Sequence, residues 1–337
     1  MQGVRKILFI QTAFIGDAIL ASAMWEAWHT SFPEDEIHVC VRAGNEVLFQ
    51  NHPFIHRVWT WDKRGGVLVR YVRLFRLGIG LRQERFDAVF TPHRHASSGV
   101  LARLTEAPIR SGFDEHPMRS GFTHTTRHEF KKGTHEVQRN HRLMDPWLES
   151  PVASSPRLYP DPHRFVEPDS GKFGVMAPAS QWGTKQWPEP KWVATCDALM
   201  EEVQKIYLVG GPGDAPLLDR IQRATAHSGV VVRSSQSLLD SAGMMQAAQW
   251  VLTNDSGPMH LASAVNAPTV AVFCSTTPDY GFGPLSLKRA VVETLHSLDC
   301  KPCGLHGHVK CPKSHFDCGQ GIDVRSVIAA IEKVSQD

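Results

Sequence analysis

Short apolar runs alternate with segments that carry apolar residues at helical spacing along most of the chain. Lys6–Ile10 is the first such run, and Ala18–Trp28 then has apolar residues three and four positions apart. This alternation predicts βαβ units and a parallel sheet. It ends in an expected helix over Asp323–Val334 with one apolar face. The main predicted strands are Lys6–Ile10, Ile37–Val41, Phe86–Phe90, Phe173–Ala177, Lys205–Val209, Val230–Arg233, Trp250–Thr253 and Thr269–Phe273.

The alternation breaks down between about Arg110 and Lys172 and then resumes, so the chain carries two α/β units. Tyr159–Gly171 is rich in proline and charge, as linkers often are. A chain of 337 residues also exceeds the usual size of one compact core. We therefore expect two α/β domains with parallel sheets, residues 1–165 and residues 166–337.

Composition indicates an ordinary globular protein. The chain is 42% hydrophobic and 21% charged, and its net charge of +2 argues neither for nor against nucleic acid. The amino-terminal apolar region could pass for a signal peptide, but Gln11, Gly16 and Asp17 interrupt it. No run of 18 apolar residues occurs elsewhere, so we expect a cytoplasmic protein without a spanning helix.

A polar corner follows the predicted strand that ends at Thr253. Asp255, Ser256 and Gly257 lie where this strand would meet a helix, and Pro258 suits a first helical position. The free N–H groups and the positive dipole end of that helix would favour a phosphate. His260 is expected to face the same corner. A helix cap beside a partly buried histidine is the alternative interpretation.

Two further loops follow strands of the same predicted domain. One supplies the hydroxyl groups of Ser180 and Thr184 and the ammonium group of Lys185, which could neutralise a phosphate. The other is a glycine-rich turn that ends at Asp214 and lacks the full dinucleotide fingerprint. A solvated lysine and a helix cap would explain Lys185 and Asp214 equally well. Three such loops on one domain nevertheless indicate a nucleotide cradle.

Several motifs together resemble glycosyltransferase family 9, the ADP-heptose:lipopolysaccharide heptosyltransferases. They are NDSGPMHLASAVNAPTVAVF (Asn254–Phe273), Lys185–Pro188, IGDAILASAMWEAW (Ile15–Trp28) and the mid-chain segment His135–Arg139. The resemblance implies a GT-B fold, with two Rossmann-like domains that face each other across a cleft. The amino-terminal domain would bind an acceptor and the carboxy-terminal domain a nucleotide sugar.

The resemblance also implies a reaction. An inverting enzyme would move a heptose from ADP-heptose to a lipopolysaccharide core or lipid A precursor, without a metal or other cofactor in catalysis. Asp17 matches the family's general base, although a helix cap would also explain this residue. A nucleotide-sugar epimerase and a heptosyltransferase with a protein acceptor are the alternatives. The residues that would contact or support the donor are Ser180, Thr184, Lys185, Asp214, Asp255, Ser256, Gly257, Pro258, Met259 and His260.

Basic residues crowd the segment Arg57–Arg85, and more lie in the irregular stretch that follows. A solvated helix face is the usual explanation of such a run. The implied acceptor, however, carries phosphates and carboxylates at an anionic membrane surface. We therefore expect Lys63, Arg64 and Arg119 to contact the acceptor, and the protein to lie peripherally on the inner membrane in a salt-sensitive way.

Four of the seven cysteines gather in one loop rich in glycine and proline. Cys300, Cys303, Cys311 and Cys318 have the spacing C-x2-C-x7-C-x6-C. Four thiolates suit a tetrahedral zinc or iron site. Reduced surface thiols or a disulfide pair are the alternatives. A metal here would staple the loop and take no part in sugar transfer.

Overall fold

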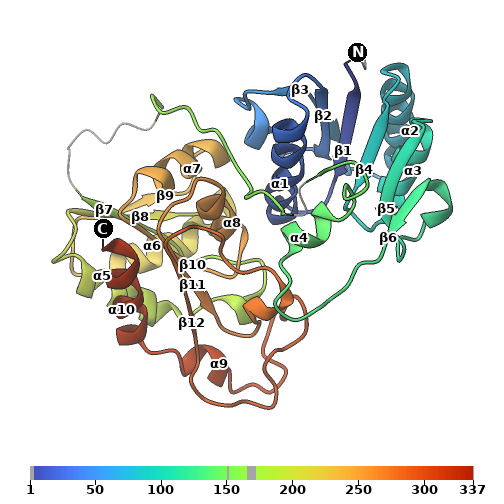
Figure 1. The fold of residues 1–337 in the computed structure, drawn as a ribbon. Coiled ribbons are helices and arrows are strands. Elements are labelled where there is room, and N and C mark those ends of the chain that lie inside the picture. The colour runs from blue at the N-terminus through green and yellow to red at the C-terminus, as the bar shows by residue number, and fades with distance from the viewer. Residues whose placement is uncertain (1–3, 150–151, 165–171, 337) are drawn as a thin grey trace. The chain divides into compact units, whose positions relative to one another are not determined.

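The computed structural model describes residues 4–149, 152–164 and 172–336 (Figure 1). Its internal contacts divide the chain into two compact units, residues 1–159 and residues 160–337. The boundary expected between residues 165 and 166 lies outside the described residues. Of the helices in the described ranges, none combines the length and the apolar character that crossing a bilayer requires.

The first unit is a six-stranded parallel sheet with the order β3-β2-β1-β4-β5-β6. Its central strand β1 is buried from Ile7 to Gln11, as the strands of a sheet covered on both faces are. Helices α1 and α4 contact each other, as do α2 and α3 (Figure 1). The elements are β1 (Lys6–Gln11), α1 (Ile15–Ser31), β2 (Glu36–Arg42), η1 (Glu46–Phe49), β3 (Ile55–Trp61), α2 (Val67–Gln83), β4 (Ala88–Thr91), α3 (Ala96–Leu104), β5 (Ile109–Phe113), η2 (Arg119–Gly121), β6 (His124–Thr126) and α4 (Glu136–His141).

The second unit has a parallel sheet with the order β12-β11-β10-β7-β8-β9. Counted from each unit's own first strand, both sheets follow the doubly wound order 3-2-1-4-5-6. The elements are β7 (Phe173–Ala177), η3 (Gly183–Lys185), α5 (Glu189–Leu199), β8 (Lys205–Val209), η4 (Pro212–Asp214), α6 (Ala215–Ala224), β9 (Val230–Arg233), α7 (Leu238–Ala247), β10 (Trp250–Asn254), α8 (Gly257–Ala264), β11 (Thr269–Phe273), η5 (Pro278–Tyr280), β12 (Arg289–Glu293), α9 (Asp317–Gln320) and α10 (Val324–Ser335).

Two strands meet closely at the centre of the second sheet. Gly174 of β7 pairs with Trp250 of β10. A Cβ atom at position 174 would lie 2.1 Å from the indole of Trp250, so only glycine lets the two strands and the ring share this space. The loops that leave these two strands carry the residues expected to bind the donor, except Asp214, which follows β8.

The expected break in alternation after Arg110 is wrong as far as His141, because β5, β6 and α4 continue the first unit there. From Arg142 to Lys172 the expectation holds, since the described residues form no helix or strand before β7. The three residues of β6 are polar and the five of β5 carry two large apolar side chains, so neither forms an apolar run. The edge strands β3 and β12 also escaped prediction. Their partly exposed residues include arginine and glutamate, which edge positions tolerate.

Candidate active site

Asn254 joins the two loops that leave the centre of the second sheet. Its side chain is fully buried, and its amide oxygen accepts a hydrogen bond from the backbone N–H of Trp187 at 3.0 Å. Its amide group donates to the Pro178 carbonyl at 2.7 Å. The sequence reasoning placed Asn254 inside a motif but gave it no role. A buried amide at a strand end, next to an acidic residue, was the available signal.

Lys185 and Asp255 form an ion pair at this edge of the sheet. The ammonium nitrogen lies 2.6 Å from Asp255 Oδ2, and the two side chains are 13% and 8% exposed. The Thr276 hydroxyl donates to the same oxygen at 2.6 Å. An ammonium group has three N–H donors, so this pairing leaves donor capacity for a bound anion. The structure thus brings together two of the residues expected to bind the donor.

Helix α8 begins directly after this ion pair. Ser256 is its N-cap, and the side chain forms no capping bond to the first turn, since the hydroxyl instead donates to the Asn254 carbonyl at 3.3 Å. Gly257 therefore starts a helix whose first N–H, together with that of the N-cap Ser256, can be presented to an anion. Pro258, in the same turn, has no N–H to offer.

The side chains further along α8 are buried. Met259 packs against Ala271 and Phe273 in a small core cluster. His260 is 6% exposed. The Met259 N–H donates to the Ser256 carbonyl at 3.1 Å, so Met259 supports the turn and offers a ligand neither its thioether nor a free N–H.

Thr184 is held by the cysteine-rich loop. Its hydroxyl donates to the His308 carbonyl at 3.0 Å and accepts from the His308 N–H at 2.8 Å and from the Ser275 hydroxyl at 3.0 Å. The residue is 2% exposed, so these bonds use its polar capacity inside the protein. Thr184 therefore ties the turn that carries Lys185 to the cysteine-rich loop.

Ser180 and Asp214 occupy more open positions. Ser180 is partly exposed, and its carbonyl accepts from the Gln186 amide at 2.6 Å. The Asp214 carboxylate accepts from the Gly211 N–H at 2.8 Å, which closes the glycine-rich turn. The sequence left two roles open for Asp214, ligand binding and a local structural role. This bond gives it the local structural role.

The central strands of the first unit also end in a polar cluster. The Thr12 hydroxyl, after β1, lies 3.1 Å from His93 Nδ1, after β4. The Lys63 ammonium donates to the Thr12 carbonyl at 2.6 Å. Burial and the charge of Arg42 lower the pKa of Lys63 to about 8. Burial, followed by the charge of Lys63, lowers the pKa of His93 to about 3, so this imidazole stays neutral.

Asp17 lies in the first turn of α1, after the same strand β1. Burial, followed by the negative charge of Glu136, raises the pKa of its carboxyl to about 6, against the smaller opposite effects of backbone N–H groups and Arg94. A carboxylate with a pKa just below neutrality is suited to accept a proton. Glu136 and Arg94 were missed, since only the fold brings them to Asp17.

The other two residues expected to contact the acceptor lie on the surface. Arg64 is exposed, and its guanidinium binds Asp62 through two hydrogen bonds of 2.9 and 3.0 Å. Arg119 is exposed in η2. Of the three basic residues singled out, the structure places Lys63 in the polar cluster after β1 and β4.

The four cysteines of the loop influence one another. Burial, and then the proximity of the other thiols, raises the pKa of Cys303. Burial also raises the pKa of Cys318 to about 11. Cys300 Sγ lies 3.8 Å from His315 Nε2, and the Cys303 N–H binds the Ser275 carbonyl at 2.7 Å. The bond from Cys303 thus anchors the loop beside the end of β11.

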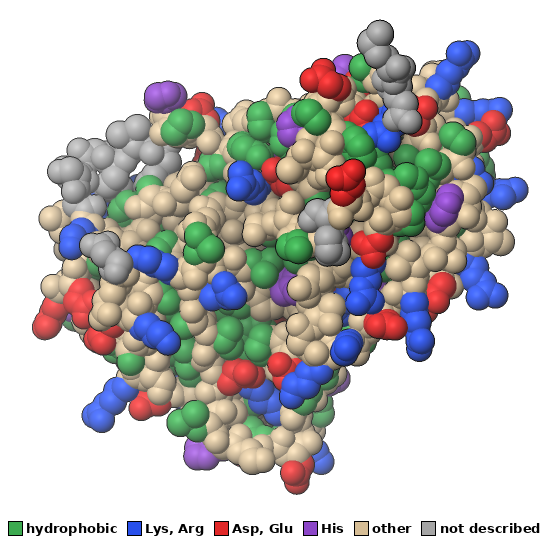
Figure 2. All heavy atoms as spheres, viewed as in Figure 1, with side chains coloured by type: hydrophobic (Ala, Val, Ile, Leu, Met, Phe, Trp, Pro, Cys, Tyr) green, Lys and Arg blue, Asp and Glu red, His purple; other side chains and the backbone are tan. Residues whose placement is uncertain are grey.

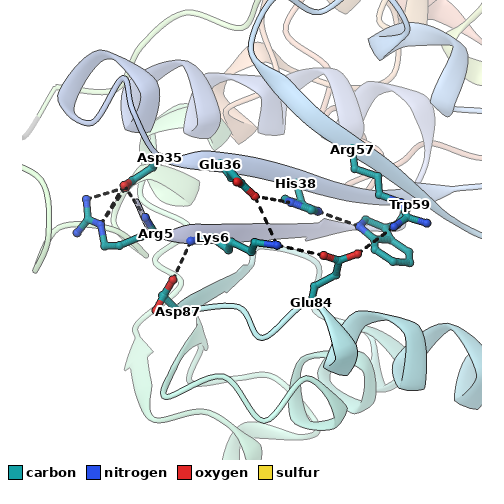
Figure 3. A network of polar contacts seen from close by, with 9 residues as sticks. All are labelled: Arg5, Lys6, Asp35, Glu36, His38, Arg57, Trp59, Glu84 and Asp87. Carbon is teal, nitrogen blue, oxygen red and sulfur yellow. Dashed lines mark hydrogen bonds and ion pairs between the residues drawn. The ribbon is translucent and has the colours of Figure 1, made fainter. Parts of the chain in front are cut away.

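Among the described residues, the one group of three potential metal ligands within 4.8 Å of one another is Glu36, His38 and His56, so the cysteine sulfurs are more widely spaced. Figure 3 shows that two members of this group, Glu36 and His38, belong to a network of polar contacts. The Trp59 indole donates to His38 Nδ1 at 3.2 Å. An indole can only donate, so the proton of neutral His38 lies on Nε2, which faces Glu36 and is closed to a metal. The Lys6 ammonium, 3.5 Å from Glu36, already supplies a cation.

Comparisons with known proteins agree with this geometry. Lipopolysaccharide heptosyltransferase 2 of Escherichia coli K12 is 24% identical over 317 residues, which cover 86% of this chain and 88% of that protein. The structure of the E. coli ADP-heptose lipopolysaccharide heptosyltransferase II aligns with a TM-score of 0.80 at 19% identity, covering 98% of both chains. A family 9 glycosyltransferase from Veillonella parvula aligns with a TM-score of 0.81 at 20% identity, covering 98% of this chain and 97% of that one.

These structures confirm the α/β class and the GT-B fold. The model of glycosyltransferase family 9 (heptosyltransferase) matches residues 74–309, which is more than half of the chain. That span includes Lys185, Asp255 and the start of α8, the parts of the second sheet whose geometry suits a phosphate. The protein is therefore an enzyme that belongs to glycosyltransferase family 9.

Proposed function

We propose that this enzyme transfers a heptose from ADP-heptose to the inner core of a lipopolysaccharide precursor, with inversion at the sugar carbon. The observation that carries the proposal is the Lys185–Asp255 ion pair beside the first turn of α8, since a cation and helix N–H groups together suit a diphosphate. The similarity to an ADP-heptose lipopolysaccharide heptosyltransferase supports the donor and the acceptor class. The family match disfavours the epimerase alternative.

In the proposed reaction, Asp17 takes the proton of an acceptor hydroxyl as that oxygen attacks the anomeric carbon of the heptose. The bond from this carbon to the ADP oxygen breaks at the same time, and ADP leaves with the electron pair. Lys185 and the first N–H groups of α8 stabilise the charge that develops on the diphosphate. Asp255 holds the ammonium group in place. The proposed reaction needs a base and a group that stabilises the charge of the leaving diphosphate, and it needs no metal.

The remaining donor contacts follow from the same placement. Ser256 and Gly257 would approach the diphosphate through the backbone, and Ser180 is open enough to add a hydroxyl. Thr184 would act by fixing the Lys185 turn. Asp214 would shape the loop near the ribose or base.

We place the acceptor on the first unit. Lys63 lies in the polar cluster that follows β1, the strand that also leads into Asp17, and its ammonium group would bind a phosphate or carboxylate of the acceptor. Arg64 and Arg119 would contact outer parts of the same anionic molecule. Because this acceptor is built on a lipid, we expect the enzyme to work in the cytoplasm, at the inner membrane surface.

We also propose that the cysteine-rich loop binds a structural zinc or iron ion through Cys300, Cys303, Cys311 and Cys318. The C-x2-C-x7-C-x6-C spacing supports the proposal, and a bound cation would draw the four sulfurs together and favour their thiolate forms. Metal analysis of protein purified without added metal, under reducing conditions, tests this. Less than about a tenth of an equivalent would overturn the four-ligand site.

The main test combines binding and product analysis. ADP should raise the melting temperature whereas UDP and NAD should not, because UDP lacks the adenine of the proposed donor and NAD carries a nicotinamide riboside in place of the heptose. Incubation with ADP-heptose and acceptors of increasing core length should then give one acceptor that gains a single heptose by mass spectrometry. A gain on protein acceptors alone would replace the acceptor assignment. Donor hydrolysis or isomerisation without transfer would overturn the proposed reaction.

A further inference from the structure

Helix α2 has a stripe of large apolar side chains that faces solvent. Its members repeat at intervals of three and four residues, which places them on one side of a helix. All are at least half exposed, up to 77% for Leu68. Isolated exposed apolar residues are common, but a stripe along three turns of one helix is an unpartnered surface. We call it the α2 stripe: Leu68, Tyr71, Val72, Phe75 and Ile79.

The other side of α2 is already packed on the first unit. Leu74, Gly78 and Leu81 are buried. A Cβ atom at Gly78 would lie 2.4 Å from the Leu104 side chain, so α2 rests directly on α3. Helix α2 therefore has two apolar sides, and only one of them packs in the core of the first unit. A rotation of the helix that buried the α2 stripe would expose the side that is now buried.

Arginines border the α2 stripe. Arg70, Arg73 and Arg76 are exposed and follow one another at three-residue steps along the flank between the stripe and the buried side. Arg73 already pairs with Asp62 at 2.7 Å, so Arg70 and Arg76 are the two that the proposal uses. The 17 residues of α2 contain no acidic residue. Figure 2 shows hydrophobic and basic side chains together in the upper right of the view, where Figure 1 places α2. This combination of apolar and cationic groups is typical of helices that lie in a bilayer interface.

We propose that the α2 stripe docks this protein on an anionic lipid bilayer. The apolar side chains enter the boundary between headgroups and acyl chains, and the flanking arginines contact lipid phosphates. A second copy of the chain fits less well, because symmetric pairing of two stripes would bring arginine flanks of like charge together. The inference concerns membrane docking and stands independently of donor and acceptor identity.

The proposal predicts two contributions to vesicle binding, apolar insertion and electrostatic attraction, which can be measured separately. Vesicles of phosphatidylcholine with one-quarter phosphatidylglycerol should bind the wild-type protein, and salt should weaken the binding only in part. The double variant Phe75→Ser, Ile79→Ser should bind at least about tenfold more weakly at low and high salt, since it removes apolar burial. The variant Arg70→Gln, Arg76→Gln should instead lose most of the salt dependence and the preference for phosphatidylglycerol.

Matched controls keep the result specific. Leu287→Ser with Leu295→Ser removes two more exposed leucines, 83% and 95% exposed, from the second unit and should leave vesicle binding unchanged. All variants should keep the wild-type melting temperature and its shift with ADP, because the changed residues lie on the surface. Equal vesicle binding by wild type and the Phe75, Ile79 variant would overturn the proposal. A concentration-dependent dimer of wild type that this variant abolishes would replace the bilayer with a second copy.

Discussion

The two sheets of this protein have the same strand order, yet the carboxylates at their carboxyl edges are treated in opposite ways. Asp255 in the second unit has a lysine ammonium 2.6 Å away and a hydroxyl donor at the same distance. Asp17 in the first unit is desolvated and lies near the negative charge of Glu136. Both effects raise the pKa of its carboxyl group. One edge pairs its carboxylate with a cation, and the other raises the pKa of its carboxyl group.

The contrast indicates how one topology can serve the two tasks that we propose for this enzyme. In both units, a side chain bridges the loops of the two central strands: Asn254 in the second, and Thr12 with His93 in the first. The framework at these positions is therefore similar, and the neighbouring charges make the difference. A stable charge clamp suits a leaving diphosphate, whereas a base needs a carboxylate with a raised pKa.

Breaking the ion pair should have the largest effect on stability. Lys185→Met leaves the Asp255 carboxylate buried without its cation, and we expect a loss of about 3–5 kcal/mol in the free energy of unfolding. ADP binding should also be lost. Urea denaturation and calorimetry with ADP measure the two effects. The double variant Lys185→Met, Asp255→Asn should regain most of the stability but no ADP binding. A loss below about 1 kcal/mol in the single variant would mean that the pair behaves as a surface pair.

Asp17→Asn should have the next largest effect, this time on turnover. Asparagine keeps the size and polarity of the side chain but cannot accept the proton, so kcat should fall by about 100-fold or more. The stability of the folded protein should rise in this variant, although its turnover falls. The raised pKa means that ionised Asp17 destabilises the fold above about pH 6, so the variant should melt higher at pH 8, with the difference gone below about pH 4. Turnover above about a tenth of wild type would exclude the base assignment.

The pH profile of kcat/KM should be bell-shaped. Below about pH 6 Asp17 is protonated, so the rate should fall about tenfold per pH unit. Above about pH 8 Lys63 loses its charge, so binding of an anionic acceptor should weaken. Lys63→Arg keeps the charge at all accessible pH values and should remove the basic limb while it leaves the acidic limb. A profile that is flat from pH 5 to pH 7 would contradict the role given to Asp17.

The sequence predicted the buried strands and the motifs, because continuous apolar runs and strand-end polar residues are local features. Phe173–Ala177 and Thr269–Phe273 agree with β7 and β11 at both ends. Strand β6, with three polar residues, has no such signal. The environment of Asp17 could not be predicted either, since Glu136 reaches it only through the packing of α4 on α1. The role of Thr184 depends on His308, which lies 124 positions away in the chain.

Thr184→Val should have the smallest effect and tests how firmly the donor edge is held. Valine has the shape of threonine but leaves the His308 N–H and the Ser275 hydroxyl without their acceptor, which should cost roughly 1–3 kcal/mol of stability. ADP affinity should fall by less than about tenfold, because Lys185 keeps its charge and its partner Asp255. Thr184→Ser retains the hydroxyl and should lie close to wild type in both measurements. If Thr184→Val abolishes ADP binding while stability is unchanged, the hydroxyl contacts the donor itself, and the cysteine-rich loop is a neighbour of the clamp without being its support.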